Sequence, residues 1–390
     1  MDLAKTFDHV DLAQAADPHA LYRQMRAQCP VAWSDKQEGF WVVTGYDEAV
    51  AVTQDPSTFS SCSVTVPRNP PFNFPTLPPT TIDPPRHRDF RKIIQPLFSP
   101  ANSRRLEEIV QERCQYLLST FIDNGRCDAS TEYALRIPVT VVVSLMGIPL
   151  EDEPLFTDWV HTAVDTWDDV ERAAGAGMAM VGYINTLIEQ RRGDPRDDVV
   201  SLLLAARDAG DITQEELYGT LFVFLTAGID TAWKVIGNAL RHLAVNHEDR
   251  KRLVDDPSLI PTATEEFLRF YAPASMGRVV IQDAELAGAS MSAQDSMLVC
   301  YPAANRDERI FDRAEEFVLD RGSHKHLAFG SGIHRCIGAA FGRMEVQMAL
   351  TAWLTQIPEF ALDPDGEVVM SQGQIWGPTS VPLVWGAALR

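Results

Sequence analysis

The sequence contains 390 residues, with 54 acidic side chains against 34 lysines and arginines, which gives a formal net charge of −20. Hydrophobic residues account for 45% and charged residues for 23%, a balance typical of globular proteins with a sizeable core. An acidic chain of this kind is a poor candidate for binding nucleic acid or an anionic membrane, although a local basic patch could still bind an acidic partner protein.

The N-terminal residues and the cysteines predict a cytoplasmic protein. Met1 is followed by Asp-Leu-Ala-Lys, without the apolar core of a signal peptide, and nowhere does an uninterrupted apolar run reach membrane-spanning length. The cysteines form no Cys-x-x-Cys pair, so we expect isolated thiols in a reducing compartment rather than a disulfide framework. They are Cys29, Cys62, Cys114, Cys127, Cys300 and Cys336.

Taken in chain order, the patterns predict a mainly helical protein with small peripheral sheets. A strand is expected over residues 40–44. The proline-dense residues 67–79 are expected to form a long surface loop with exposed aromatics, either a lid or binding element or a plain insertion. Helices are expected over residues 102–122, 181–192 and 217–245, and further strands over residues 296–300 and 381–385. No repeat or long linker divides the sequence, so we expect one domain over residues 1–390.

The segment around Cys336 carries the strongest chemical signal. Residues 329–338 read Phe-Gly-Ser-Gly-Ile-His-Arg-Cys-Ile-Gly, and the glycines permit a tight loop that a flat cofactor can approach closely. A helical pattern begins after Gly338, so Cys336 lies just ahead of a helix, where backbone N–H groups and the helix dipole stabilise a thiolate. An iron ligand needs such a thiolate. A small buried cysteine is the alternative, while zinc would need two further ligands beside His334 and Cys336.

This string, F-G-x-G-x-H-x-C-x-G, resembles the haem-binding loop of the cytochrome P450 superfamily at every fixed position. The resemblance implies the triangular, mainly α-helical haem-thiolate domain of that family, with haem b (iron protoporphyrin IX) as cofactor. Cys336 would be the iron ligand, and its thiolate would favour O–O cleavage. Phe329 would pack near the thiolate, His334 would reach a haem propionate, and Gly330 and Gly338 would belong to the cofactor-binding loop.

The resemblance covers most of the chain and is nearest to the soluble bacterial class. Family-like segments follow one another from Asp83 to Trp385 in the expected order, and the closing segments look most like bacterial camphor hydroxylase. Two departures are minor. Ala232 stands where many members carry a second threonine, and Glu308 replaces a common proline.

The helix predicted over residues 217–245 contains an acid–alcohol pair. A capping box at residues 213–216 marks its start, and Gly228 costs a helix interior about 1 kcal/mol relative to alanine, so this glycine needs a reason. Thr231 can bond to a carbonyl one turn earlier and loosen the helix, and Asp230 beside it suits a proton relay. The alternative is a small-residue helix contact with a surface acid. The segment resembles the distal helix of the family, which implies catalytic roles for Ala227, Gly228, Asp230 and Thr231.

Glu266 and Arg269 form an E-x-x-R pair at a helical spacing that is common and weakly stabilising in general. The pair falls where the P450 family carries its E-x-x-R helix. There it locks the cysteine loop together with a later arginine, for which Arg321 is the candidate. The implied role is structural.

A third string begins at Asp83 and reads Asp-Pro-Pro-Arg-His-Arg-Asp-Phe-Arg. The aspartate and prolines indicate a helix start, and His87 and Arg91 then fall one turn apart on one face. That face could bind an anionic propionate, or it could be a solvated basic helix end. The family carries a similar D-P-P-x-H-x-x-x-R segment, which implies propionate binding, and Arg278 matches a third propionate-binding position.

The resemblance further implies a monooxygenase that uses O2 and two electrons to hydroxylate a small hydrophobic substrate. No flavin- or iron–sulfur-domain sequence follows the haem segment, so electrons are expected from a separate ferredoxin and its NAD(P)H-dependent reductase. Basic residues on the cysteine side would steer an acidic ferredoxin to that side. They are Arg86, Arg88, Lys92, Arg335 and Arg343. We expect a monomer that binds neither nucleic acid nor membrane.

Mostly apolar residues match the family's substrate pocket and predict a terpenoid, steroid or aromatic substrate. They are Phe72, Phe74, Val223, Thr226, Ala227, Ala274, Ser275, Gln374, Ile375 and Trp376. Two alternatives remain. A peroxide-driven peroxygenase is disfavoured by the Asp230–Thr231 pair, and a non-catalytic haem-based sensor would bind a ligand without substrate-dependent NADH consumption.

Overall fold

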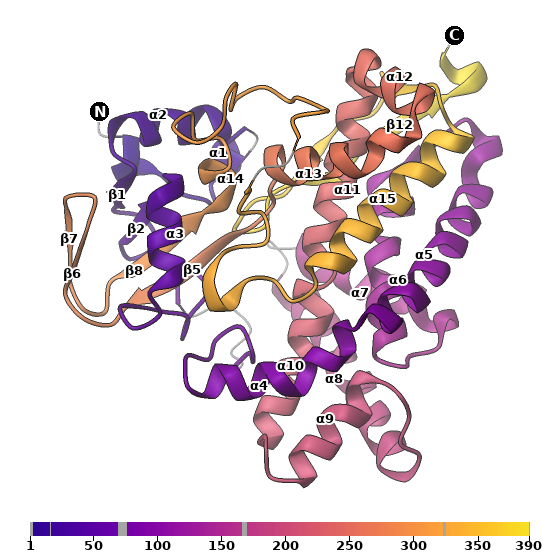
Figure 1. Ribbon diagram of the computed structural model, residues 1–390. Coiled ribbons are helices and arrows are strands. Elements are labelled where there is room, and N and C mark those ends of the chain that lie inside the picture. Colours follow the sequence, from indigo (N-terminus) through magenta and orange to yellow (C-terminus); the bar gives the residue numbers. More distant parts are fainter. Residues whose placement is uncertain (1–2, 16, 69–75, 166–169, 323–324, 390) are drawn as a thin grey trace. The chain divides into compact units, whose positions relative to one another are not determined.

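The computed structural model describes residues 3–15, 17–68, 76–165, 170–322 and 325–389 (Figure 1). They group into two compact units, each assembled from several stretches of the chain. Unit 1 comprises Met1–His87, Thr262–Ile337 and Met370–Gly377, and unit 2 comprises Arg88–Pro261, Gly338–Val369 and Pro378–Arg390.

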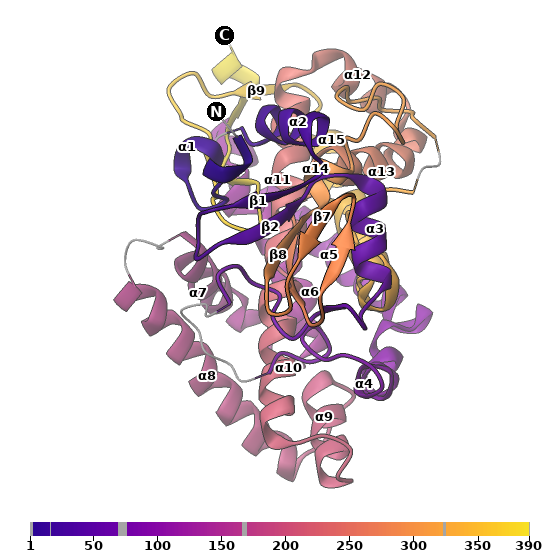
Figure 2. The same cartoon turned by 90° about the vertical axis from the view of Figure 1, so that its left-hand side faces the viewer.

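Unit 1 is built around a five-stranded sheet of order β1-β2-β8-β5-β3 (Figure 2). Its strands are β1 (Val31–Ser34), β2 (Phe40–Val43), β3 (Phe59–Ser60), β5 (Ser275–Val280) and β8 (Ser296–Cys300). β2 and β8 run parallel, and the other neighbours are antiparallel. A hairpin of β6 (Ala284–Leu286) and β7 (Ala289–Met291) extends from it.

Helices cover both faces of this sheet. Successive strand residues point to opposite faces, so Val42 and Leu298 pack with the residues of α2 (His19–Gln28), whereas Val43 and Val299 pack with those of α3 (Tyr46–Gln54). Further helices of the unit are η1 (Leu3–Thr6), α1 (Leu12–Ala15), α14 (Tyr301–Ala304), η7 (Gly332–His334) and most of α13 (Ile260–Phe270). The sheet therefore has an apolar core on each side.

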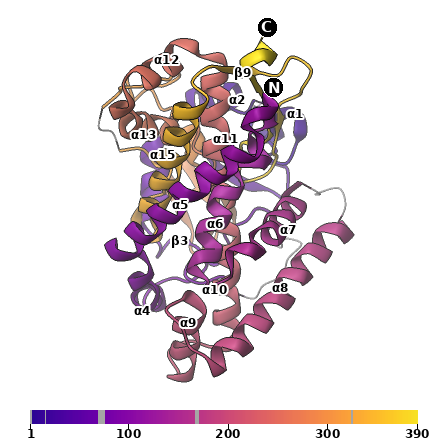
Figure 3. The same ribbon diagram turned by 90° about the vertical axis from the view of Figure 1, so that its right-hand side faces the viewer.

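Unit 2 is mainly helical (Figure 3). Its helices are most of α4 (Arg86–Ile94), α5 (Pro100–Phe121), α6 (Arg136–Leu145), α7 (Glu153–Asp165), α8 (Val170–Gly193), α9 (Val199–Asp208), α10 (Gln214–Ala227), α11 (Asp230–Val245), α12 (His247–Asp255) and α15 (Ala339–Gln356). Helices α5, α6, α11 and α15 pack on one another around the fully buried rings of Tyr133, Trp233 and Trp353.

Short elements complete unit 2. A three-stranded sheet orders as β4 (Arg126–Asp128), β12 (Pro382–Trp385) and β9 (Phe360–Leu362), and β10 (Val369–Met370), which straddles the unit boundary, pairs with β11 (Pro378–Ser380). The remaining turns are η2 (Gln95–Phe98), η3 (Ile122–Asn124), the π-turn η4 (Ser130–Ala134), η5 (Leu150–Asp152), η6 (Pro257–Leu259) and η8 (Gly386–Leu389).

The predicted fold class is confirmed: the protein is mainly helical with small sheets. The strands predicted over residues 40–44, 296–300 and 381–385 correspond to β2, β8 and β12, and the helix over residues 102–122 corresponds to α5. The helix over residues 181–192 is part of the longer α8. Several helices, α6, α9 and α12 among them, were not predicted.

The single helix predicted over residues 217–245 is wrong in one respect, because the structure divides it into α10 and α11. Gly228 and Ile229 form a turn between them, in which the Gly228 amide bonds to Thr226 rather than to a carbonyl a full turn back. Together residues 214–245 are long and apolar enough to cross a membrane, but 61% of the relevant window is buried, as in the core helix of a globular unit.

Candidate functional site

Cys336 lies at the end of a glycine-rich loop in unit 1. Its backbone amide donates to the Phe329 carbonyl at 2.8 Å, which closes the loop. Gly330 and Gly332 have φ of +66° and +69°, a region that favours glycine. A Cβ on Gly332 would collide with the backbone carbonyl of Thr53 in α3. The loop therefore needs glycine both for its backbone conformation and for its close packing.

The thiols of the chain divide into buried and exposed groups. Cys114, Cys127 and Cys300 are buried, and burial raises the pKa of the Cys114 and Cys300 thiols to about 12, so these two remain protonated near neutral pH. Cys29, Cys62 and Cys336 are exposed. Of these three, Cys336 alone stands in a glycine loop and precedes a helix by three residues, as a thiolate ligand requires.

Two predicted propionate-binding residues meet near this loop. The rings of His87 and His334 lie with centroids 4.3 Å apart, and His334 Nε2 is 3.9 Å from Asp83 Oδ1. Asp83 also accepts hydrogen bonds from the Ser61 amide at 3.1 Å and from the Ser60 hydroxyl. Burial alone would raise the pKa of Asp83, but the charge interaction with His334 and the hydrogen bonds from Ser60 and Ser61 outweigh it and lower that pKa. Asp83 thus connects two segments to β3, namely the segment that leads into α4 and the turn η7.

Arg278, the third predicted propionate-binding residue in unit 1, is buried on β5. Its Nη1 donates to the Gly277 carbonyl at 2.6 Å, and its guanidinium interacts with the buried hydroxyl of Tyr301. The Tyr301 hydroxyl also lies beside Gly330 of the cysteine loop, since a Cβ placed on that glycine would be 3.4 Å from it. A cation is therefore connected through Tyr301 to the cysteine loop. Sequence reasoning missed Tyr301, since no motif marks it.

The E-x-x-R pair is fully buried within unit 1. Arg269 donates to both carboxylate oxygens of Glu266 at 2.8 Å, and Arg321 Nε lies 3.1 and 3.0 Å from the same two oxygens. Arg269 also donates to the carbonyls of Asn305 and Ala314 at 2.8 and 2.9 Å. The three charged side chains thereby fasten the irregular segment that leads to the cysteine loop.

The acid–alcohol pair lies at the junction of α10 and α11 in unit 2. Thr231 Oγ1 donates to the Ala227 carbonyl at 3.2 Å, the back-bond expected from the sequence. A Cβ on Gly228 would come within 2.7 Å of the Phe224 carbonyl, so the turn needs glycine. Asp230 is the first residue of α11, where the helix dipole favours a negative charge.

The chain has clear relatives among known proteins. The family model described as cytochrome P450 matches residues 258–379. Vitamin D(3) 25-hydroxylase of Pseudonocardia autotrophica is 34% identical over 89% of this chain and 88% of its own, and the monooxygenase PikC of Streptomyces venezuelae is 33% identical over 95% and 92%.

The chain belongs to the cytochrome P450 family. Its relatives show that it is a P450 monooxygenase, and membership of the family implies a haem cofactor. The crystal structure of CYP101C1 superimposes with a TM-score of 0.89 at 29% identity, over 99% of this chain and 98% of the other. The crystal structure of CYP109E1 from Bacillus megaterium in complex with testosterone superimposes with a TM-score of 0.87 at 28% identity. The match covers 97% of this chain and 100% of the other.

The residues of unit 1 fit a haem. An exposed thiol on a loop with two left-handed glycines is suited to a flat iron cofactor, and the cations of Arg278 and, when protonated, of His87 and His334 suit its carboxylates. Arg91 follows His87 by one turn on α4 and is half-buried.

The residues predicted to line the substrate pocket of this P450 are only partly described. Phe72 and Phe74 lie outside the described residues. In unit 1, Ser275 and Ile375 belong to paired segments, since the Ser275 amide donates to the Gln374 carbonyl at 2.7 Å and Ala274 bridges to Ile375. In unit 2, Val223 and Thr226 are half-buried and Ala227 is exposed, all on α10.

The side chains of Gln374 and Trp376 make contacts within unit 1 that stabilise its fold. The Gln374 side chain donates to the carbonyls of Val64 and Ser275 and accepts from the Val66 amide, each at 2.9 Å. Trp376 is buried with its ring edge-on to His19, 4.9 Å between centroids. The Gln374 amide is therefore engaged by three backbone groups of unit 1.

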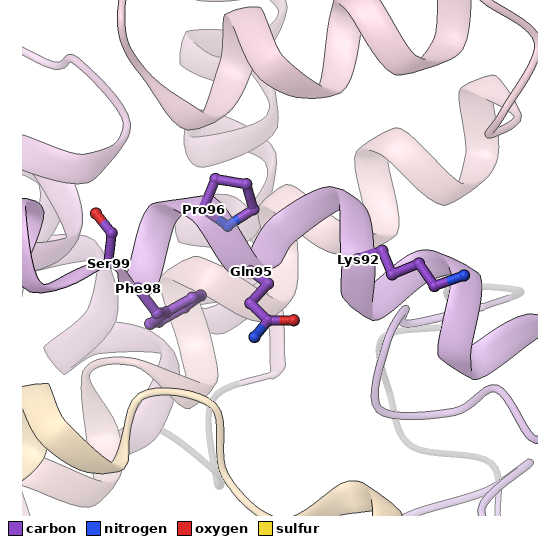
Figure 4. Close-up of a pocket in the computed structure, with 5 residues that line it drawn as sticks. All are labelled: Lys92, Gln95, Pro96, Phe98 and Ser99. Carbon is purple, nitrogen blue, oxygen red and sulfur yellow. The ribbon is translucent and has the colours of Figure 1, made fainter.

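An open hollow in unit 2 contains none of the residues predicted to bind haem or substrate. Figure 4 shows its lining residues following one another at the end of α4, along η2 and just beyond it. They are Lys92, Gln95, Pro96, Phe98 and Ser99.

Proposed function

We propose that this P450 uses Cys336 as the thiolate ligand of haem b and hydroxylates a hydrophobic molecule of the steroid class. The observation that carries the proposal is the closed glycine loop ending in an exposed cysteine directly ahead of α15. A helix N-terminus lowers the free energy of a thiolate, which favours a Cys336 that is ionised and ready to bind iron.

When bound, the haem would supply the activation of O2. The task of His87, His334 and Arg278 is to neutralise its propionates, with Arg91 as a further cation on α4. Asp83 lies 3.9 Å from His334 Nε2, and this contact helps to orient the histidine ring for that role.

Asp230 and Thr231 would move protons to the oxygen-binding side. The Thr231 hydroxyl hydrogen is directed to the Ala227 carbonyl, which leaves the lone pairs of Oγ1 free to accept a hydrogen bond from a ligand. Asp230 retains part of its exposure to solvent, with 18% of its side chain accessible, and can therefore exchange protons with water. An acid beside an oriented hydroxyl is the arrangement that general acid catalysis needs.

Electrons would come from a separate ferredoxin with its NAD(P)H-dependent reductase. Arg88, Lys92 and Arg335 are exposed on a chain whose net charge is −20. Exposed basic side chains on an acidic chain can steer an acidic partner and raise its association rate at low salt.

Two relatives favour the steroid class. One is vitamin D(3) 25-hydroxylase, and the other is CYP109E1, whose structure contains testosterone. Other relatives, such as mycinamicin IV hydroxylase/epoxidase, carry names that point to a different substrate. The mainly apolar residues predicted for the pocket suit a substrate with few polar groups.

An optical titration of the ferric protein tests the substrate class. We expect a tight low- to high-spin shift with vitamin D3 or steroids and weaker shifts with monoterpenes and simple aromatics. Val223→Trp on α10 should abolish the shift, whereas Val245→Trp at the exposed end of α11 should leave it unchanged. A tight shift with another class alone would overturn the steroid assignment.

Thr231→Ala tests the proton role. A monooxygenase with this relay would consume NADH and release peroxide in place of product. Unchanged product per NADH in the variant would contradict the role of Thr231.

A further inference from the structure

Lys234 is a fully buried lysine in the first half of α11. None of its side chain is exposed, and its ammonium nitrogen lies 3.8 Å from Asp230 Oδ1, one turn earlier on the helix. The same nitrogen lies 3.3 Å from the centre of the Trp233 ring. The only sequence sign of this position is a charged residue within the apolar run Ala-Trp-Lys-Val-Ile.

Burying an ammonium is costly, because the charge loses its hydration. In Lys234 a carboxylate and an aromatic face stand in for part of the lost water, and both interactions strengthen away from solvent. The spacing places the acid N-terminal to the base by four residues, the more favourable order on a helix. Even so, an apolar residue of similar volume usually stabilises a core as well as a buried ion pair does. The stability of α11 alone does not account for a lysine here.

The two partners differ in their exposure to solvent, and this difference indicates that Lys234 acts on Asp230. The lysine is completely enclosed, whereas 18% of the Asp230 side chain remains accessible, and Asp230 opens α11 directly after the Gly228–Ile229 turn. The enclosed ammonium lies one helical turn from this carboxylate, so its attraction for Oδ1 limits the positions that the carboxylate occupies.

We propose that Lys234 is a positioning residue for Asp230, fixing the acid so that it delivers protons to the Thr231 side of the junction rather than swinging freely into solvent. This inference rests on the proposed proton role of Asp230 and Thr231. Lys234 touches neither substrate nor cofactor in it, and it acts only through the carboxylate one turn away.

The test compares Lys234→Met with Lys251→Met in the haem-loaded protein. Lys251 is the matched control, since it also pairs with an aspartate four residues away, Asp255, but is 72% exposed. We expect Lys234→Met to lower product per NADH by roughly tenfold and to release peroxide, less than the loss from removing a proton donor itself. It should also raise the solvent isotope effect on product formation. Lys251→Met should change none of these.

Asp230→Asn separates the inference from the function on which it rests. Normal coupling in Asp230→Asn would overturn the proton role itself. If Asp230→Asn leaks peroxide while Lys234→Met couples as well as Lys251→Met, the proton role stands and the inference about Lys234 is wrong. In Asp230→Asn, adding Lys234→Met should cause no further loss of coupling, because the residue acts through Asp230.

A second pair of variants covers a failure of Lys234→Met to fold, which the absence of a thiolate-type ferrous–CO spectrum would reveal. Lys234→Arg keeps the charge and Lys234→Gln removes it. Retained coupling in the arginine variant with lost coupling in the glutamine variant supports the inference. Equal coupling in both overturns it.

Discussion

The rings of His87 and His334 lie 4.3 Å apart, although 246 residues separate them in the chain. Asp83 completes the group by its contact with His334, and it is itself fixed by Ser60 and Ser61 on and beside β3. One carboxylate therefore connects the start of α4, the turn η7 and the sheet of unit 1, and it does so beside the loop that carries Cys336.

Asp83→Asn should destabilise the protein by about 1–2 kcal/mol, because hydrogen bonds that assist a charged carboxylate would become neutral ones. The lowered pKa of Asp83 gives the sign of the pH dependence: its contribution is present above the unfolded pKa and is lost as pH falls through the folded one, below about 3.8. Urea unfolding at pH 3 and pH 7 measures this. Asp365→Asn on an exposed turn is the control, and an equal loss at both pH values would contradict the prediction.

Glu266→Gln should be far more damaging. The substitution removes one charge from a cluster in which Glu266 and Arg269 are completely buried, and this leaves two guanidinium groups without their counterion. Breaking such a buried pair costs about 3–5 kcal/mol. The free energy of unfolding and the amount of haem retained on purification should both fall. Arg313→Ala removes an arginine whose ion pairs are longer and exposed, and its effect should stay within about 0.5 kcal/mol.

The sequence predicts best what is local and contiguous. The cysteine loop, the E-x-x-R pair and the Asp83 string are each read from adjacent residues, and the structure gives each one a defined geometry. The break at Gly228 was not predicted, because the apolar pattern runs through it without a change of period. Whether an interruption forms there depends on packing against Phe224 and Val142, which belongs to the tertiary structure.

Burial and long-range partners could not be predicted. A lysine in an apolar helical run can reach the surface by its flexible stem, so nothing in the sequence distinguishes the enclosed Lys234 from an exposed one. Tyr301 likewise gains its importance only when β5 brings Arg278 beside it. Gln374 likewise bonds three backbone groups that lie far from it in the chain, and its place in the substrate pocket stays a prediction.

Gly332→Ala should impair the cysteine loop more than Gly322→Ala. Both glycines have positive φ, so each alanine carries the same backbone penalty of about 1 kcal/mol. A Cβ on Gly322 meets nothing within 4 Å, whereas one on Gly332 collides with Thr53. The difference in unfolding free energy and in haem retention between the two variants isolates the collision. Equal behaviour would mean that the loop moves away from α3 at little cost.

Cys336→Ser should abolish the absorption that thiolate-ligated ferrous haem shows with carbon monoxide, and monooxygenase activity with it. The physical reason is that serine carries no thiolate and cannot donate its electron density to iron. Cys62→Ser, which removes another exposed thiol of unit 1, should leave spectrum and activity unchanged. A thiolate spectrum that survives Cys336→Ser would exclude Cys336 as the ligand.

Glu345 makes the stability of the protein depend on pH in a direction opposite to Asp83. This residue of α15 is buried, and its Oε2 has no hydrogen-bond partner among the described residues. Burial raises the pKa of Glu345 to about 8, well above its ordinary value of 4.5. A raised folded-state pKa means that the stability is complete below the unfolded pKa and is lost as pH rises toward the folded one, by at most about 1.4 kcal/mol per pH unit.

Glu345→Gln should therefore flatten the pH dependence between pH 4.5 and pH 8, since the amide has no proton to lose in this range. At pH 5 the variant and the parent should unfold with similar free energies. At pH 8 the slope of about 1.4 kcal/mol per pH unit should make the variant more stable than the parent by several kcal/mol. Urea unfolding at four pH values, with Glu367→Gln on an exposed segment as the control, measures the difference. A constant gap between variant and parent across this range would show that Glu345 ionises in the folded protein as it does in the unfolded chain.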